Sequence, residues 1–194
     1  MERKRVMILF INACIRKNSR TKQLADHLIN KFNEPIEEIN LLDQHFPLVD
    51  EDFLNTRDAL LKGRNYDDPL FAMARQFSEA DRIIVAAPYY DLSFPASLKQ
   101  YFEQINCVGI TFKYAPEGYP IPLCNAKQLI YVMSAGGEFV PEEFGFGYVK
   151  SLAENFYGIK DVRLVKAVGL DIDGADVDKI MEDAMKQIDN CFVQ

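Results

Sequence analysis

Short, uninterrupted apolar runs constrain the fold of this chain more than any other feature of its sequence. Residues 6–11, 82–87 and 129–133 are almost entirely aliphatic or aromatic, without alternating polar residues. A strand with one solvated face alternates apolar and polar residues, whereas a strand covered on both faces does not. The sequence therefore predicts a mostly parallel sheet covered on both faces. The strands are expected at residues 6–11, 35–40, 82–87, 129–133 and 162–169.

Segments with helical periodicity separate these strands. The last segment has a single apolar stripe made by Val177, Ile180, Met181, Ala184, Met185 and Ile188. The spacing of Leu24, Leu28 and Phe32 predicts another helix. Further helices are expected at residues 52–62, 69–80, 95–106 and 148–157, while the rest of 41–69 and residues 111–123 lack simple periodicity. The alternation indicates an α/β fold, and we expect residues 1–194 to form one domain.

Composition and charge argue against several classes of function. The formal net charge is -7, whereas sequence-independent nucleic-acid binding needs a surplus of Lys and Arg. No apolar run approaches the ~20 residues of a membrane span. The four cysteines are scattered without the two-residue spacing of a zinc or dithiol site. We therefore expect reduced thiols in a cytoplasmic protein, with no metal cluster and with neither nucleic acid nor a membrane as a partner.

The connector after the first strand, residues 12–21, carries features of an anion site. In a doubly wound sheet, ligands bind beyond the carboxyl ends of the strands. Hydroxyls at Ser19 and Thr21 stand at the start of a helix, whose free amides and dipole favour an anion. The surrounding stretch 16–22 is basic, which favours a phosphate. An ordinary helix cap with a solvated basic face is the alternative, and neither a Gly-x-Gly-x-x-Gly nor a Walker motif follows this strand.

Two further connectors have unusual sequences for plain loops. Tyr89 and Tyr90 directly follow the third strand, where they would cover a bound ring or simply close the end of the sheet. Gly136 and Gly137 follow the fourth strand, where paired glycines allow close backbone approach to a ligand or form a tight turn. For the tyrosine pair and for the glycine pair, the ligand-binding and the purely structural interpretation both remain open.

These connectors resemble those of the FMN-dependent NAD(P)H dehydrogenase (quinone) and NADH-azoreductase family, a branch of the flavodoxin-like fold. The most specific match is Ala-Pro-Tyr-Tyr-Asp-Leu at residues 87–92, followed by Leu-Lys-Gln-Tyr-Phe at 98–102 and Gly-Ile-Thr-Phe-Lys-Tyr at 109–114. Residues 156–162 also resemble the family's segment before the fifth strand. The resemblance implies a three-layer sandwich with strand order 2-1-3-4-5, FMN as cofactor and NADH or NADPH as electron donor.

The resemblance also implies which residues bind the flavin. Ser19, Arg20 and Thr21 are expected to hold the phosphate. The other expected cofactor-binding residues are Cys14, Pro88, Tyr89, Tyr90, Asp91, Leu92, Ser134, Ala135, Gly136 and Gly137. Cys14, Asp91 and Ala135 depart from the family's usual Ser, Asn and Arg, which bears on substrate preference and flavin potential more than on flavin binding. We expect the side chain of Asp91 to point away from the ring or to be held by donors.

The expected reaction follows from the cofactor. Hydride transfer at flavin N5 needs no catalytic side chain, and the amides of Gly136 and Gly137 would stabilise the reduced ring. The resemblance implies ping-pong reduction of quinones or azo compounds by a homodimer whose second subunit closes the pocket. Candidates for the aromatic lining, which could equally be core or dimer contacts, are Phe112, Tyr114, Phe139, Phe144, Phe146 and Tyr148.

Other functions have weaker support. Neither His27 nor His45 pairs visibly with a Ser or Cys, so nucleophilic catalysis is not indicated. The serious alternative is a flavodoxin-like electron carrier, although its usual Thr-x-Thr-Gly-x-Thr phosphate loop is absent. A flavin-binding redox or partner module without turnover of its own is a third possibility.

Overall fold

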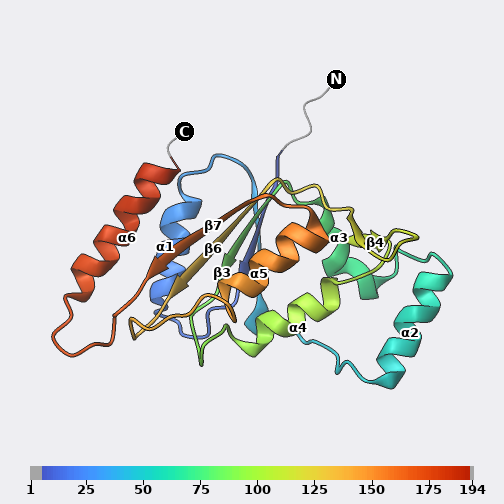
Figure 1. Ribbon diagram of the computed structural model, residues 1–194, viewed down its shortest axis with the longest axis horizontal. Coiled ribbons are helices and arrows are strands. Elements are labelled where there is room, and N and C mark those ends of the chain that lie inside the picture. Colours follow the sequence, from blue (N-terminus) through green and yellow to red (C-terminus); the bar gives the residue numbers. More distant parts are fainter. Residues whose placement is uncertain (1–5, 193–194) are drawn as a thin grey trace.

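A five-stranded parallel sheet forms the centre of the computed structural model, which describes residues 6–192 (Figure 1). Its strands are β1 (Ile8–Asn12), β2 (Ile36–Asn40), β3 (Arg82–Ala86), β6 (Gln128–Ser134) and β7 (Asp161–Ala167). They lie in the order β2-β1-β3-β6-β7, and each neighbouring pair is parallel. The expected α/β sandwich and its order 2-1-3-4-5, numbered over these strands alone, are confirmed.

Helices cover both faces of the sheet, as its uninterrupted apolar strands require. Helices α1 (Arg20–Ile29) and α6 (Val177–Cys191) cover one face. Helices α3 (Ala72–Glu79), α4 (Ala96–Ile105) and α5 (Phe146–Leu152) cover the other (Figure 1). Helix α2 (Glu51–Lys62) buries no residue completely and lies at one end of the molecule. No described helix is long and apolar enough to cross a membrane.

The side chains on the two faces of the interior strand β1 belong to two separate cores. Ile8 and Phe10 pack with α1 and α6, whereas Leu9 and Ile11 pack with α3, α4 and α5. All four side chains are buried. Because successive strand residues point to opposite faces, an unbroken apolar run is the pattern that a doubly covered strand needs.

The structure corrects several local expectations. Residues 111–123, which show no simple periodicity, contain the antiparallel hairpin of β4 (Phe112–Tyr114) and β5 (Pro120–Pro122). Helix α1 ends at Ile29, so Phe32 packs against the core from outside the helix. Short turns η1 (Leu41–Asp43) and η2 (Pro69–Phe71) precede α2 and α3, and η3 (Ala153–Tyr157) continues α5 as a π-helix.

A chain of polar side chains joins the amino ends of three strands. Arg82 begins β3 and donates to Glu34 (2.9 Å) and to Gln128 (2.8 Å), the first residue of β6. Gln128 in turn donates to Asp161, the first residue of β7, whose carboxylate also accepts from Arg163 at 2.8 Å. The hydrogen bond from Arg163 is the main cause of the lowered pKa of Asp161. This network lies at the end of the sheet opposite the connectors of interest.

Replacing Asp161 tests this network through its pH dependence. The lowered pKa means that the carboxylate stabilises the fold above its ordinary pKa, and that this contribution is lost as pH falls through the folded-state value. Because the pair is partly exposed, we expect Asp161→Asn to lower the free energy of unfolding by only about 0.5–1 kcal/mol at pH 7. Urea unfolding at a series of pH values should show this difference shrinking below about pH 4. A difference that stays constant down to pH 2.5 would contradict the assignment.

Candidate functional site

A polar cavity of about 320 Å³ lies beyond the carboxyl ends of the strands, where the connectors after β1, β3, β6 and β7 meet. Its lining residues are Arg16, Asn18, Ser19, Arg20, Thr21, Pro88, Tyr89, Tyr90, Ser134, Ala135, Gly136, Leu170 and Asp171. The three connectors singled out from the sequence therefore come together at one rim. The fourth connector, after β7, was not expected to take part.

The amino end of α1 forms one wall of this cavity. Ser19 caps the helix, because its hydroxyl accepts a hydrogen bond from the amide of Lys22 at 3.3 Å. First-turn amides have no partner inside a helix, so those of Arg20 and Thr21 remain available as donors. The nearby cations Arg16 and Lys17 are exposed and have no ion-pair partner among residues 6–192. This wall combines free amides, hydroxyls and positive charge, which is the donor set that a phosphate requires.

Two side-chain links tie α1 to the opposite wall. The hydroxyls of Thr21, which is completely buried, and Ser134 at the end of β6 share a hydrogen bond of 2.7 Å. Arg20 forms an ion pair with Asp171 in the connector after β7, with 2.8 Å between Nη1 and Oδ1. The helix start is therefore held in register with the ends of β6 and β7.

The glycine pair after β6 has a different role at each position. A Cβ atom on Gly136 would overlap Oδ2 of Asp171 and lie 3.0 Å from its Cγ, so this glycine leaves space for the carboxylate. At Gly137 the nearest atom to a Cβ would be the amide nitrogen of Phe139, 4.0 Å away. No described group accepts a hydrogen bond from the amide of either glycine. Gly136 lines the cavity, whereas Gly137 follows it in the connector and is not among the lining residues.

Tyr89 and Tyr90 hold the connector after β3 against the one after β6. The amide of Tyr89 donates to the carbonyl of Ser134 at 3.0 Å, and its hydroxyl donates to the carbonyl of Pro141 at 2.9 Å. Burial, and secondarily the carboxylate of Glu143, raises the pKa of Tyr89, so this hydroxyl remains a donor at neutral pH. The main chain of Tyr90 then pairs with Ser93 in both directions, at 2.9 and 2.8 Å.

The turn between these paired residues is strained. Its central residues, Asp91 and Leu92, have φ angles of 48° and 68°, as a type I′ turn requires. Such a turn favours Asn and Gly, and a residue like Leu pays roughly 1–2 kcal/mol for left-handed backbone. Asp91 and Leu92 are both exposed and do not line the cavity. Strain of this kind concentrates at functional sites, because surrounding structure must hold it in place.

Cys14 lies beneath the cavity wall instead of lining it. Its amide donates to the side chain of Asn12 at 3.0 Å, and Asn12 donates to Glu38 at 2.9 Å. Burial raises the pKa of the Cys14 thiol to about 11. A neutral thiol packed in this way supports the loop and supplies no charge to the site.

The aromatic residues proposed for the substrate lining are dispersed in this chain. Phe112 is buried against Phe156, with ring centroids 4.6 Å apart, and Tyr148 packs on Phe94 and Phe102. Tyr114 is exposed on the β4–β5 hairpin. None of the proposed aromatic residues lines the cavity of its own chain.

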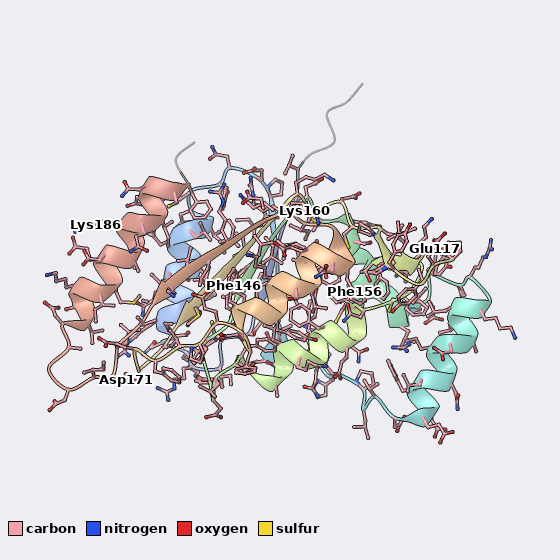
Figure 2. The ribbon with its side chains drawn as sticks, viewed as in Figure 1. Glu117, Phe146, Phe156, Lys160, Asp171 and Lys186 are labelled. Atoms are coloured by element: carbon pink, nitrogen blue, oxygen red, sulfur yellow. The ribbon has the colours of Figure 1, made fainter. Side chains whose placement is uncertain are left out.

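Figure 2 shows how far this hairpin lies from the cavity. Glu117, in the turn of the hairpin, and Asp171, beside the cavity, stand at opposite ends of the molecule. Phe139 and Phe144 follow β6 near the cavity and are 80% and 61% exposed. An aromatic surface thus exists beside the cavity, but Phe112 and Tyr114 do not belong to it.

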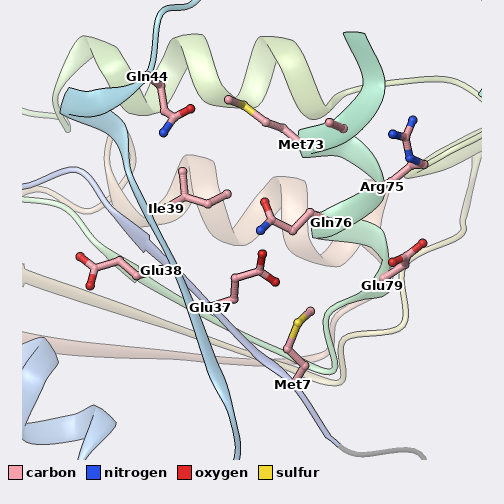
Figure 3. A pocket seen from close by; sticks show the side chains of 10 residues that line it. Met7, Glu37, Glu38, Ile39, Gln44, Met73, Arg75, Gln76 and Glu79 are labelled. Carbon is pink, nitrogen blue, oxygen red and sulfur yellow. The ribbon is translucent and has the colours of Figure 1, made fainter. Parts of the chain in front are cut away.

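A larger hollow of about 620 Å³ lies elsewhere, between β2 and α3 (Figure 3). Its lining residues are Met7, Glu37, Glu38, Ile39, Gln44, Ala72, Met73, Arg75, Gln76 and Glu79. It shares no residue with the cavity at the strand ends. Its one cation, Arg75, already donates to the carbonyls of Tyr66 and Asp68. The hollow therefore offers acidic and apolar surface without the convergent donors of the smaller cavity.

The loop after β7 is the part of the site that sequence reasoning missed. Leu170 and Asp171 enter the cavity because β7 lies next to β6, so their connectors run side by side. The amides of Leu170 and Asp171 donate to the carbonyls of Ala135 and Gly136 at 3.2 and 2.9 Å. The expected strand order already placed these two connectors together, and the carboxylate of Asp171, a few residues after the fifth strand, was the available signal.

Fold and site together define a doubly wound α/β protein with a polar cavity, lined by hydrogen-bond donors and two arginines, at its topological switch point. The sequence profile of the flavodoxin-like fold family matches residues 7–191, and the chain belongs to that family.

Similar proteins cover nearly the whole chain. An FMN-dependent NADH:quinone oxidoreductase of Coprothermobacter proteolyticus is 34% identical over 96% of this chain and 98% of its own length. Another of that name, from Clostridium beijerinckii, is 37% identical over 93% of this chain and 94% of its own. A crystal structure of an azoreductase from Bacillus anthracis superposes with a TM-score of 0.84 over 96% of this chain and 98% of that chain, at 23% identity.

The two glycines allow a matched test of the space for Asp171. We expect Gly136→Ala to lower the free energy of unfolding by about 1 kcal/mol, because the new methyl group must displace the Asp171 carboxylate and disturb its exposed ion pair with Arg20. Gly137→Ala should change it by less than about 0.5 kcal/mol, because that space is open. Chemical denaturation measures both, and Asp171→Ala should restore much of the stability lost in Gly136→Ala. Equal losses for the two glycine variants would refute this role of Gly136.

A double-mutant cycle tests the link between α1 and β6. Thr21→Val and Ser134→Ala should each cost about 1–2 kcal/mol of unfolding free energy, because each leaves the other hydroxyl without its partner. The double variant should cost clearly less than the sum of the two. Additive losses in urea unfolding would show that the hydroxyl pair contributes nothing as a pair.

Proposed function

We propose that residues 1–194 act as one FMN-binding domain that oxidises NADH and reduces quinones, azo compounds or similar small acceptors. The observation that carries this proposal is the meeting of a phosphate-type donor set, two tyrosines and Gly136, whose amide is unpaired among the described residues, around one cavity. Relatives at 34% and 37% identity bear the name FMN-dependent NADH:quinone oxidoreductase. Their near-complete coverage of this chain supports the same activity here.

The residues present fit a flavin mononucleotide. Ser19, Arg20 and Thr21, with the free amides of α1, would hold the phosphate. Pro88, Tyr89 and Tyr90 would line the flavin ring. Asp91 and Leu92 lie outside the cavity lining and would act only by holding Tyr90 through their turn. When bound, FMN supplies a ring that takes up a hydride from the nicotinamide and releases the electrons to an acceptor.

The connector after β6 would tune the reduced state of the cofactor. Ser134, Ala135, Gly136 and Gly137 would lie at the pyrimidine end, where negative charge collects on reduction. The amides of Gly136 and Gly137 have no acceptor in residues 6–192, so they are free to donate. A hydrogen bond to a charged group is worth roughly 1.5–3 kcal/mol. No side-chain acid or base is required in this proposal.

A homodimer would complete the substrate pocket. Phe139 and Phe144 expose aromatic surface beside the cavity, which a second copy would cover. Tyr114 is exposed on the hairpin remote from its own cavity, so a part in substrate binding would place it at the partner's site, whereas Phe112 is buried. Because one pocket would serve donor and acceptor in turn, the kinetics would be ping-pong. The cytoplasmic location expected from the sequence also remains a prediction.

Flavin binding and turnover test the proposal directly. Purified protein reconstituted with FMN should be yellow, and NADH should bleach the flavin under anaerobic conditions. With a quinone added, NADH oxidation should reach the order of 10 s⁻¹, and double-reciprocal plots at several quinone concentrations should be parallel. Riboflavin, which lacks the phosphate, should bind at least about 100-fold more weakly than FMN.

Three outcomes separate this proposal from its alternatives. Protein that stays colourless after incubation with FMN would rule out the cofactor. Bound FMN that accepts no hydride from NADH or NADPH would indicate an electron carrier. Faster reduction by NADPH than by NADH would reassign the donor while leaving the reaction class intact.

A further inference from the structure

Only one nitrogen of the Arg20 guanidinium, Nη1, makes hydrogen bonds to described residues. Its Nη1 donates to Oδ1 of Asp171 at 2.8 Å and to the carbonyl of Leu170 at 3.4 Å. No described residue accepts a hydrogen bond from its Nε or Nη2. An arginine carries five N–H donors in a fixed plane, so the tether to Asp171 leaves most of them for another acceptor. Arg20 also lines the cavity.

Asp171 is itself held in place by the connector after β6. Its amide donates to the carbonyl of Gly136 at 2.9 Å, and its carboxylate fills the space that a side chain on Gly136 would need. Gly169, with a φ of 78°, turns the chain after β7 and donates to the carbonyl of Gly137 at 3.0 Å. The carboxylate therefore sits on a backbone that is hydrogen-bonded to the rim of the sheet.

The carboxylate of Asp171 lies at the mouth of the proposed phosphate site, where its negative charge would by itself oppose binding. Alone, Asp171 would repel an anion, but Arg20 neutralises it, and the pair leaves the charge of Arg16 and the free amides of α1 unopposed. Holding a long, flexible arginine in one place also removes entropy that phosphate binding would otherwise have to overcome. The same contact thus restrains Arg20 and keeps the cavity mouth from becoming acidic.

We propose that Asp171 is a positioning residue that holds Arg20 at the cavity mouth so that its remaining donors bind the phosphate of the mononucleotide. The inference rests on the proposed function, because it presupposes a phosphate-bearing flavin in this cavity. It adds a residue from the connector after β7 to a site otherwise built by three connectors. The proposal also explains the glycine at position 136, because a side chain there would occupy the space of the Asp171 carboxylate.

Comparison of FMN with riboflavin tests this role. Dissociation constants for both flavins are measured by fluorescence quenching during titration of the apoprotein. Asp171→Ala should weaken FMN binding about 3- to 10-fold, because the side chain of Arg20 must then be ordered on binding. Riboflavin binding should change by less than about twofold, because it lacks the phosphate. Asp171→Asn, which keeps an acceptor oxygen, should lose less than Asp171→Ala.

Two further variants make the test specific. Asp173→Ala removes an exposed carboxylate from the same connector and should leave both dissociation constants unchanged. In an Arg20→Met background, Asp171→Ala should cause no further loss of FMN affinity and should even improve it, because an unpaired carboxylate then faces the phosphate. Thermal unfolding of each variant establishes that it is folded.

Each remaining outcome overturns the proposal. Unchanged or tighter FMN binding in Asp171→Ala would show that the carboxylate competes with the phosphate for Arg20. Equal weakening of FMN and riboflavin would reduce Asp171 to a structural residue. A wild-type protein that binds neither flavin would overturn the proposed function as well, whereas FMN binding with NADH turnover and an inert Asp171 would overturn this inference alone.

Discussion

Coverage of the sheet on both faces is the constraint on which the rest of the structure depends. Ile8 and Phe10 of β1 enter one core while Leu9 and Ile11 enter the other, so neither face of this interior strand has room for polar chemistry. Parallel strands also bring all their carboxyl ends to one edge. Polar groups that must act together are therefore confined to the connectors along that edge, and the cavity lies there.

Hydrogen bonds between connectors turn this edge into one structural unit. Thr21 joins α1 to the end of β6, and Tyr89 joins the connectors after β3 and β6. Backbone bonds from Leu170 and Asp171 to the carbonyls of Ala135 and Gly136 join the connectors after β6 and β7. Such cross-links restrict the separate motion of loops, which lowers the entropy that a ligand must overcome to bind. They also stabilise the strained turn at Asp91 and Leu92 in its left-handed conformation.

Features of the fold and the site could be predicted where a short stretch of sequence encodes them, and not where they depend on which strands are neighbours. The apolar runs of β1, β3 and β6 and the cap at Ser19 are local patterns, and they led to the sheet and to one wall of the cavity. The role of Asp171 depends on β7 lying beside β6, and no short stretch of sequence shows this. The two glycines look alike in sequence, yet only Gly136 makes room for a side chain. The β4–β5 hairpin was missed because its strands have three residues each and one of them carries two prolines.

The local arrangement of charge also explains how an acidic chain can offer a site for an anion. The net charge of -7 is spread over the whole surface, and at physiological salt, charges beyond about 8 Å are largely screened. Among the residues that line the cavity, Arg16, Arg20 and the positive end of the α1 dipole stand against the carboxylate of Asp171. Because Arg20 neutralises that carboxylate, the charge of Arg16 leaves the lining residues net positive. The charge that a ligand meets is thus set by a few side chains at the strand ends and not by the composition of the chain.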